Sequence, residues 1–247
     1  MITFFIIATK GYKEYARSLM SSIDYHLKSD FEIQLLTDDV AHFSDLAVSK
    51  TRGNLKPSTI ESLGWPAATL LRYELMLSRF HTVSGSVICY LDADTLFARD
   101  TTISDFLRHL TDTRPVAAVR HPGYFKRSML LRLLNVSVLG PWETRRSSSA
   151  FVPFRHRKDY VCGGVIFGLA AAFRTMCEEI QHLIEIDRHR GIIARHNDES
   201  YLNAWCLQHS TARLSPEWAY AAGYRNLGDL KPRIEVVHKP SDWKREI

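Results

Sequence analysis

The stretch CYLDADTLF, residues 89–97, decides the fold class of this chain. Residues 86–91 form a short apolar run without Gly or Pro, which predicts a buried strand. Asp92 and Asp94 then follow at the expected end of that strand, where open α/β sheets bind their ligands. Because a hard divalent cation compensates two neighbouring carboxylates, the pattern indicates a metal that holds a diphosphate. A solvated turn explains the isolated triplet equally well.

Length and composition predict an ordinary globular protein. The chain has 247 residues, of which 45% are hydrophobic and 24% charged, enough for one domain or two tightly joined lobes. The opening residues Met1–Ala8 lack a basic region before the apolar run, so they predict a first strand rather than a signal peptide. No run approaches the roughly 18 apolar residues of a membrane span. The four cysteines lie in apolar runs without metal-type spacing, which favours a reduced, cytoplasmic protein.

The formal net charge of +5 admits a nucleic acid or an anionic membrane surface as partner. Basic residues concentrate in Arg145–Lys158 and near the C-terminus, and no nucleic-acid-binding pattern accompanies them. We therefore expect no nucleic-acid partner. A solvated basic face, or contact with phosphate or a lipid surface, fits better.

Apolar periodicity alternates along the chain between the strand and helix patterns. It predicts strands over 1–8, 32–37, 86–91, 115–120 and 163–168, and helices over 12–27, 66–79, 103–110 and 170–190. Residues 58–65 have loop character, and 121–154 form an irregular excursion expected to carry substrate contacts. The order predicts an α/β fold with a mostly parallel central sheet flanked by helices on both faces.

A second acidic cluster occurs in HNDESYLN, residues 196–203. A helix start explains it simply, with Asn197 or Asp198 as N-cap and acidic residues in the first turn. Beside an upstream Asp-x-Asp, the cluster also fits glycosyl transfer. That reaction needs a carboxylate near an oxocarbenium-like carbon and electrophilic assistance for the leaving group.

The string DESYLN (198–203), followed by LSPEW (214–218), resembles the active-site helix and downstream segment of glycosyltransferase family 6. That family includes the histo-blood-group A and B transferases and the α1,3-galactosyltransferase. The resemblance runs nearly end to end. It includes the following further positions: Ala8, Lys10, Tyr12, Trp65, Arg72, Asp92, Asp94, His121–Tyr124, Glu143, Arg145, Ala150–Pro153, Tyr160, Gly163 and Gly164.

The resemblance implies a Rossmann-like nucleotide-diphospho-sugar transferase fold of type A, with residues 1–247 forming one catalytic domain. Its nucleotide-binding part would span about 1–100 and its acceptor-binding part about 101–247. The implied activity is a retaining, metal-assisted α-glycosyltransferase, a hexosyltransferase that moves GalNAc or Gal from UDP-GalNAc or UDP-Gal to the 3-hydroxyl of a galactoside. The acceptor glycan can be lipid-linked, which allows peripheral membrane contact.

Donor roles carry over residue by residue. Asp92 and Asp94 would hold Mn²⁺ or another divalent cation, with Ala93 between them also at the donor. Three residues of the first strand and helix would face the uracil: Ala8, Thr9 and Tyr12. Arg72 and Asp198 would contact the donor sugar or ribose, and Lys239 the diphosphate. Without the resemblance, Tyr12 would be explained as core, and Arg72 and Lys239 as solvated charges.

Reaction and acceptor roles carry over in the same way. Glu199, with Asp198 beside it, would act at the anomeric carbon, as nucleophile or as electrostatic stabiliser. His121 and Trp218 would contact the acceptor, although His121 alone would be explained as a loop residue. Counting from Pro153, the donor-selecting positions fall on Cys162, Gly163 and Gly164. Small residues there leave room for an acetamido group, whereas a shift of one residue would put Val165 at the deciding place.

Departures from the family pattern concern both substrates. His196 and Asn197 stand where Trp and His are usual, and Ala221 replaces a usual acidic acceptor contact. The vertebrate membrane anchor and stem are missing, which favours a bacterial- or phage-type cytoplasmic member. Many bacterial members carry Asn-x-Asn and work without a metal, whereas this chain keeps both aspartates. Two alternatives stay open: a glycogenin-like UDP-glucose transferase, and a catalytically silent carbohydrate-binding protein on the same fold.

Overall fold

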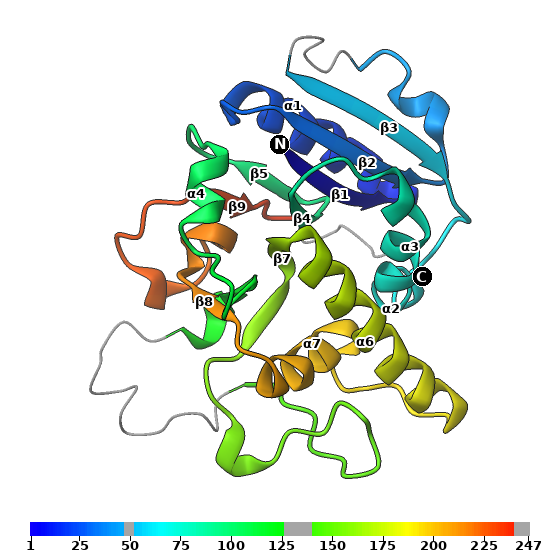
Figure 1. Ribbon diagram of the computed structural model, residues 1–247, viewed down its shortest axis with the longest axis vertical. Coiled ribbons are helices and arrows are strands. Elements are labelled where there is room, and N and C mark those ends of the chain that lie inside the picture. Colours follow the sequence, from blue (N-terminus) through cyan, green and yellow to red (C-terminus); the bar gives the residue numbers. More distant parts are fainter. Residues whose placement is uncertain (47–51, 126–139, 240–247) are drawn as a thin grey trace.

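The computed structural model describes residues 1–46, 52–125 and 140–239. A seven-stranded sheet runs through the molecule in the order β3-β2-β1-β4-β7-β6-β8 (Figure 1). Only β7 is antiparallel to its neighbours, so the expected mostly parallel sheet is confirmed. The strands are β1 (Ile2–Ala8), β2 (Phe31–Thr37), β3 (Gly53–Thr59), β4 (Val87–Asp92), β6 (Val116–Arg120), β7 (Val161–Leu169) and β8 (Ala212–Leu214). A separate antiparallel pair joins β5 (Thr95–Phe97) to β9 (Ile234–Val236).

Helices cover both faces of this sheet because successive strand residues point to opposite sides. Phe4 and Ile6 of β1 belong to one apolar cluster, with α1 (Lys13–His26) and α4 (Ile103–Leu107). Phe5 and Ile7 belong to the other, with α3 (Arg72–Arg79), α6 (Ala170–His189) and α7 (Asn197–Gln208). The result is a three-layer sandwich in which both strand faces are buried.

Short helical segments lie between the longer helices and strands. α2 (Ala67–Leu70) precedes α3. The 3₁₀ turns are η1 (Lys10–Tyr12), η2 (Val40–Phe43), η3 (Phe80–Thr82), η4 (Pro122–Tyr124), η6 (Phe154–His156), η7 (Pro216–Ala219) and η8 (Arg225–Leu227). Within the described ranges, no helix combines the length and the apolar character needed to cross a membrane. All four cysteines are buried free thiols.

The structure differs from the sequence-based expectations in several places, and the short strands β5, β8 and β9 were also not predicted. Strand β3 was not predicted, because its residues are polar and include Pro57, which an edge strand tolerates. The predicted helix over 66–79 is divided into α2 and α3 at Leu71. Helix α7 has His196 as its N-cap, so Asn197 and Asp198 lie inside the first turn. Residues 126–139 of the irregular excursion lie outside the described part of the chain.

An irregularity in β7 shapes the site. Ala118 of β6 pairs with Ile166, but Arg120 pairs with Val161, so the β7 stretch is longer than the β6 stretch opposite it. Gly163 and Gly164 lie in this β-bulge, a feature that re-aims a strand locally. The bulge lies on the strand that pairs with β4.

Candidate active site

Three parts of the fold meet where β4 ends. Asp92, the last residue of β4, is paired in register with Ile7 of β1. The β7 bulge approaches from the other side of β4, since Leu91 pairs with Val165. The first turn of helix α7 also reaches this region. There the Glu199 carboxylate accepts a hydrogen bond from the Gly163 backbone N–H at 3.0 Å. The two acidic clusters of the sequence therefore lie in one region.

Arg72 is the connection between these two clusters. Its Nη1 lies 3.2 Å from Asp198 Oδ2, and its Nη2 lies 3.5 Å from Asp92 Oδ1. Nη1 also donates to the Gly163 carbonyl at 2.9 Å, and the guanidinium lies 4.5 Å from the centre of the Tyr90 ring. The residue is 4% exposed. A buried guanidinium between two carboxylates is a structural element rather than a solvated surface charge.

Asp92 is held from two directions. Its Oδ1 accepts a hydrogen bond from the Tyr90 hydroxyl at 2.8 Å and faces Arg72. Its Oδ2 lies toward Gly164, where an added Cβ would come within 2.8 Å of it. The Asp92 side chain keeps 37% of its surface exposed. It is thus oriented by the protein but accessible from solution.

Asp94 is more deeply buried and has a cationic partner. Its carboxylate forms an ion pair with the Lys239 ammonium, which lies 4.7 Å from the centre of the Tyr12 ring. Lys239 also donates to the Tyr12 hydroxyl at 3.2 Å. Burial, and then the charge of Asp92, raises the pKa of Asp94 despite the opposing effect of Lys239. Two carboxylates that repel each other at a strand end are a suitable donor set for a divalent cation.

The acidic pair of α7 has strongly shifted ionisation. Burial raises the pKa of Glu199 to about 7, although the nearby Tyr160 hydroxyl acts to lower it. Burial also raises the pKa of Asp198 to about 6, against the opposing charge of Arg72. Perturbed carboxylates that share a site with a buried cation are characteristic of active sites. The helix start is therefore not the whole explanation of this cluster.

The two bulge glycines lie against the carboxylates. A Cβ on Gly163 would lie 3.0 Å from Asp198 Oδ2 and 3.3 Å from Arg72 Nη1. On Gly164 it would lie 2.8 Å from Asp92 Oδ2. Cys162 differs, because its thiol is directed toward the Val119 carbonyl, 3.6 Å away, and it belongs to the core. Glycine at these two positions lets the backbone approach the acidic groups.

The expected nucleotide side lies at the end of β1. Ala8 is buried as the last residue of that strand. The Thr9 hydroxyl donates to the Leu63 carbonyl at 2.8 Å, and Tyr12 ends the turn η1 that follows. Ala93 is 4% exposed and packs in the core between the two aspartates of the motif.

The two residues expected at the acceptor have different environments. The His121 ring packs among Tyr124, Tyr160 and Tyr224, and burial, together with nearby His196, lowers its pKa to about 4. Since Tyr160 also lies near Glu199 and affects its pKa, the ring of Tyr160 lies between His121 and the acidic pair. Trp218, by contrast, is fully buried in the apolar core. Trp218 thus has no exposed surface in this structure, and its contact with an acceptor stays a prediction.

Trp218 is buried for a clear physical reason. It lies in η7, and its ring centre is 5.0 Å from that of Phe106 and 5.2 Å from that of Phe167. Arg233 covers it, with the guanidinium 4.9 Å from the ring centre. A large aromatic side chain placed against one face of the sheet completes the core.

Several residues that hold the site were not predicted from the sequence. Tyr90 lies two residues before Asp92 on the same strand face, a period that could have identified it. Asn203 lies four residues after Glu199, donates to the Glu199 carbonyl at 2.8 Å and exchanges two hydrogen bonds with Val161. Asp187 is fully buried and accepts from the Tyr201 hydroxyl at 3.1 Å. Only the tertiary structure reveals this last contact, because α6 and α7 are separate elements.

In the described part of the chain, no cluster of three or more His, Cys, Asp or Glu side chains is arranged to hold a metal. The protein would thus supply two carboxylates, from Asp92 and Asp94. Oxygen ligands from a diphosphate and water would have to complete the coordination of a hard cation.

Comparison with known proteins agrees with the site. The sequence model of glycosyltransferase family 6 matches residues 1–246. The O-antigen biosynthesis glycosyltransferase WbnI of Escherichia coli is 24% identical over 235 residues, which cover 94% of this chain and 92% of that protein.

Animal enzymes are also similar. The globoside alpha-1,3-N-acetylgalactosaminyltransferase 1 of Gallus gallus is 26% identical over 226 residues, which cover 86% of this chain and 60% of that enzyme. The alpha-1,3-galactosyltransferase 2 of Homo sapiens is 32% identical over 108 residues, or 43% of this chain and 30% of that enzyme. The sheet order and helical layers fit the type A glycosyltransferase fold expected from the sequence.

Proposed function

The chain belongs to glycosyltransferase family 6, and we propose that it transfers GalNAc or Gal from a UDP-sugar to the 3-hydroxyl of a galactoside, with retention of configuration. The observation that carries the proposal is the pair of contacts from Arg72 to Asp92 and Asp198. They join a strand-end motif suited to a diphosphate and an acidic pair suited to a sugar carbon. The names of the relatives, which include GalNAc and galactose transferases, support the same donor class.

The diphosphate would be held at the Asp-x-Asp motif. We assign Asp92 and Asp94 as ligands of Mn²⁺ or another divalent cation, since both are carboxylates and Asp94 is buried beside Asp92. When bound, that cation would neutralise the negative charge that the departing diphosphate develops. Lys239 already contacts Asp94 and supplies a positive charge to the same place. Tyr12, beneath the Lys239 ammonium, would lie against the uracil.

The sugar would lie between the motif and α7. Arg72 would orient the donor sugar or ribose while it keeps Asp198 ionised and in place. Glu199 would act on the anomeric carbon from the acceptor side. The Gly163 N–H would fix its carboxylate before the donor arrives. Such preorganisation is the usual source of transition-state stabilisation.

The acceptor would approach from the side of His121. Because the pKa of His121 is about 4, its imidazole is neutral near pH 7 and can hydrogen-bond a sugar hydroxyl. Ala221 offers no carboxylate where the family usually has one, so acceptor selection would depend on His121 and the tyrosines around it. We keep a galactoside-containing glycan, free or lipid-linked, as the acceptor class.

The small residues of the bulge favour UDP-GalNAc as donor. Gly164 has no side chain and lies directly beside Asp92, so an acetamido group at this position would meet no side chain of residue 164. Cys162 would contribute through its backbone, since its thiol is directed into the core. Size alone discriminates weakly, so we expect residual turnover of UDP-Gal. The division into a nucleotide-binding part (about 1–100) and an acceptor-binding part (about 101–247) belongs to the same proposal.

A donor screen tests the proposed function. UDP release is measured with Mn²⁺ for UDP-GalNAc, UDP-Gal and UDP-glucose, with and without lactose as a plain galactoside. We expect release from UDP-GalNAc and UDP-Gal that increases when lactose is present. Preference for UDP-glucose would favour the glycogenin-like alternative. Binding of UDP without any release over long incubation would favour a silent binding protein.

A further inference from the structure

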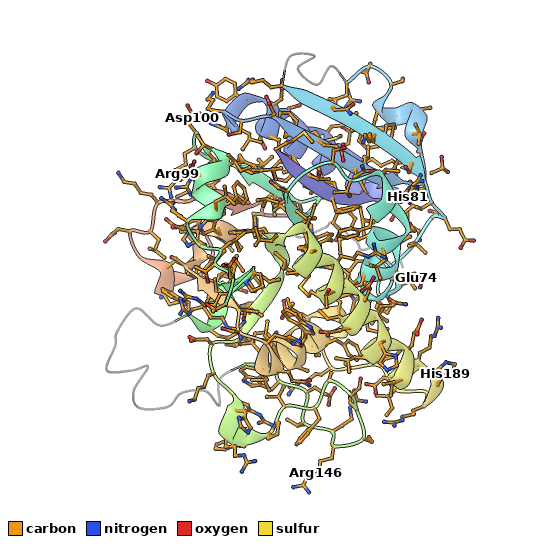
Figure 2. The ribbon with its side chains drawn as sticks, in the orientation of Figure 1. Glu74, His81, Arg99, Asp100, Arg146 and His189 are labelled. Carbon is orange, nitrogen blue, oxygen red and sulfur yellow. The ribbon has the colours of Figure 1, made fainter. Side chains whose placement is uncertain are left out.

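Two neighbouring segments, residues 143–147 and 153–158, form one basic face with a segment distant in the sequence, residues 188–196. The Arg145 guanidinium donates to the Ile193 carbonyl, and Arg190 Nη1 donates to the Ser147 carbonyl at 3.3 Å. The first and third segments are therefore joined directly. In Figure 2, Arg146 lies at the lower end of the molecule and His189 at its lower right edge, and both point away from it.

Glu143 is buried under this face and connects its three segments. Its carboxylate accepts from the Arg195 backbone N–H at 2.8 Å and pairs with Arg145 at 2.7 Å. Its backbone carbonyl accepts from Val152, whose own carbonyl accepts from Arg157 at 3.1 Å. Burial would raise the pKa of Glu143, but its hydrogen bonds lower the pKa to about 2, so it stays ionised as a fixed anchor.

The charge of the face is almost purely positive. Glu143 is the only acidic residue in the three segments and is 2% exposed. Neighbouring Asp159 pairs with Arg120 at 3.0 Å. The cations are Arg145, Arg146, Arg155, Arg157, Lys158, Arg188, Arg190 and Arg195, of which all but the half-buried Arg157 are exposed. The summed charge of these cations exceeds the net charge of +5 of the whole chain, so the remaining residues together are close to neutral.

Two apolar side chains are exposed among these cations. Phe154 and Ile193 each keep 56% of their surface exposed. Phe154 lies in η6, with the Arg157 guanidinium 5.7 Å from its ring centre. Ile193 lies beside Arg145 in the loop that leads from α6 to α7. Exposed apolar side chains flanked by arginines are characteristic of surfaces that bind at a lipid–water interface.

We propose that this basic face docks the protein on an anionic lipid surface. The arginines would pair with lipid phosphates, for which their planar guanidinium groups are well suited. Phe154 and Ile193 would insert between the headgroups. The proposal needs no transfer activity, because it rests on surface charge and exposed apolar groups alone.

The position of the face gives the docking a functional consequence. Arg195 and His196 directly precede Asn197, where α7 begins, and α7 carries Asp198 and Glu199. A protein held by this face would therefore have the start of α7, the helix that carries the acidic pair, on its membrane side. A glycan attached to a lipid would be presented to that region.

Co-sedimentation with vesicles tests the proposal. The full chain is mixed with phosphatidylcholine vesicles with and without phosphatidylglycerol, near physiological ionic strength. We expect binding that requires phosphatidylglycerol. The triple variant R146Q/R155Q/K158Q should bind about a hundredfold more weakly, since each cation near an anionic surface contributes about fivefold. Phe154→Ser should weaken binding about tenfold with the charge unchanged.

A matched control keeps the test specific. The variant R108Q/R114Q/K231Q removes the same charge from exposed residues outside the three segments and should bind as the wild type does. Equal loss in both triple variants would overturn the proposal, because binding would then follow net charge alone. Absence of vesicle binding, or tighter binding to a single-stranded RNA than to the vesicles, would also overturn it. Circular dichroism of every variant identifies those that do not fold.

Discussion

Arg72 and Asp198 form a buried ion pair, with 3.2 Å between Nη1 and Oδ2, that fixes the first turn of α7 against α3. The same guanidinium reaches Asp92 at the end of β4 and the Gly163 carbonyl in the β7 bulge. One side chain thus sets the relative positions of the groups proposed to hold the donor. The predictions below follow from this arrangement.

Replacing Arg72 by lysine should harm both stability and catalysis. Lysine keeps the charge but cannot span Asp92 and Asp198 with two nitrogens, so one buried carboxylate loses its partner. We expect a loss of about 2 kcal/mol in the free energy of unfolding and of roughly a hundredfold in kcat/KM. Chemical denaturation and donor turnover measure these. Arg79→Lys, at the end of the same helix, should change neither.

Glu199→Gln should reduce kcat by about a hundredfold or more while donor KM stays nearly constant. Glutamine keeps the size and the hydrogen bond from Gly163 but removes the charge that stabilises a cationic carbon. Steady-state kinetics with UDP release gives both constants, and Glu178→Gln on α6 serves as the control. If donor KM rose while kcat stayed constant, Glu199 would be only a helix-start residue.

The pH dependence of kcat/KM should reflect the ionisation of Glu199. Because the pKa of Glu199 is about 7 and the ionised form is the active one, kcat/KM should increase with pH between about 6 and 8. The remaining kcat/KM of Glu199→Gln should no longer decrease toward low pH. If kcat/KM of the variant decreased toward low pH as in the wild type, another group would be responsible for this pH dependence.

Stability should change with pH in the opposite direction. The folded state binds the Glu199 proton more tightly than the unfolded state, whose value is near 4.5. Its contribution to the free energy of unfolding is therefore greatest below about 4.5 and decreases as the pH rises through about 7. Glu199→Gln should consequently be more stable than wild type at pH 8, by about 1–3 kcal/mol. Thermal unfolding at pH 5 and pH 8 measures the difference.

Asp94→Asn should abolish metal-dependent turnover with the fold intact. The change removes one of the two carboxylates and the ion pair with Lys239, and it relieves repulsion from Asp92. We expect a rate loss of at least about a hundredfold, with an unchanged circular dichroism spectrum. Asp100→Asn, an exposed change outside the site (Figure 2), is the matched control. Full wild-type turnover with the metal chelated would contradict the role assigned to Asp94.

Gly164→Ala tests the donor-selecting position. The new Cβ would meet Asp92 Oδ2 at 2.8 Å, so the carboxylate must shift and turnover of both donors should decrease. The loss should be greater for UDP-GalNAc, because the methyl group also fills space needed by the acetamido group. Gly223→Ala, where a Cβ meets nothing within 4 Å, is the control. A wild-type preference for UDP-Gal that the substitution leaves unchanged would contradict this assignment.

The sequence predicted the parts of the fold that have strong local periodicity. Strand β4 and the acidic residues after it follow from an apolar run that ends in Asp92, and α6 follows from its apolar stripe. Strand β3 has no such signal, because its stability comes from pairing with β2 at the edge of the sheet. Polar strands of this kind are identified only by their neighbours.

The residue types of the site could be predicted from the sequence, but the contacts between these residues could not. Asp92 and Asp198 were both candidates, yet nothing local indicates that Arg72 bridges them, since the three belong to separate elements. The β7 bulge also depends on register with β6, which is a tertiary property. The buried position of Trp218 could not be predicted either, because a family motif does not reveal that its ring packs on Phe106 and Phe167.

The most direct test of the account is the structure of the reaction product. Wild-type protein is incubated with UDP-GalNAc, Mn²⁺ and lactose, and the product is examined by nuclear magnetic resonance. The account predicts a GalNAc residue in α linkage to the 3-hydroxyl of the galactose, formed in step with UDP release. A β-linked product, or no product with either UDP-GalNAc or UDP-Gal from a folded protein, would contradict it.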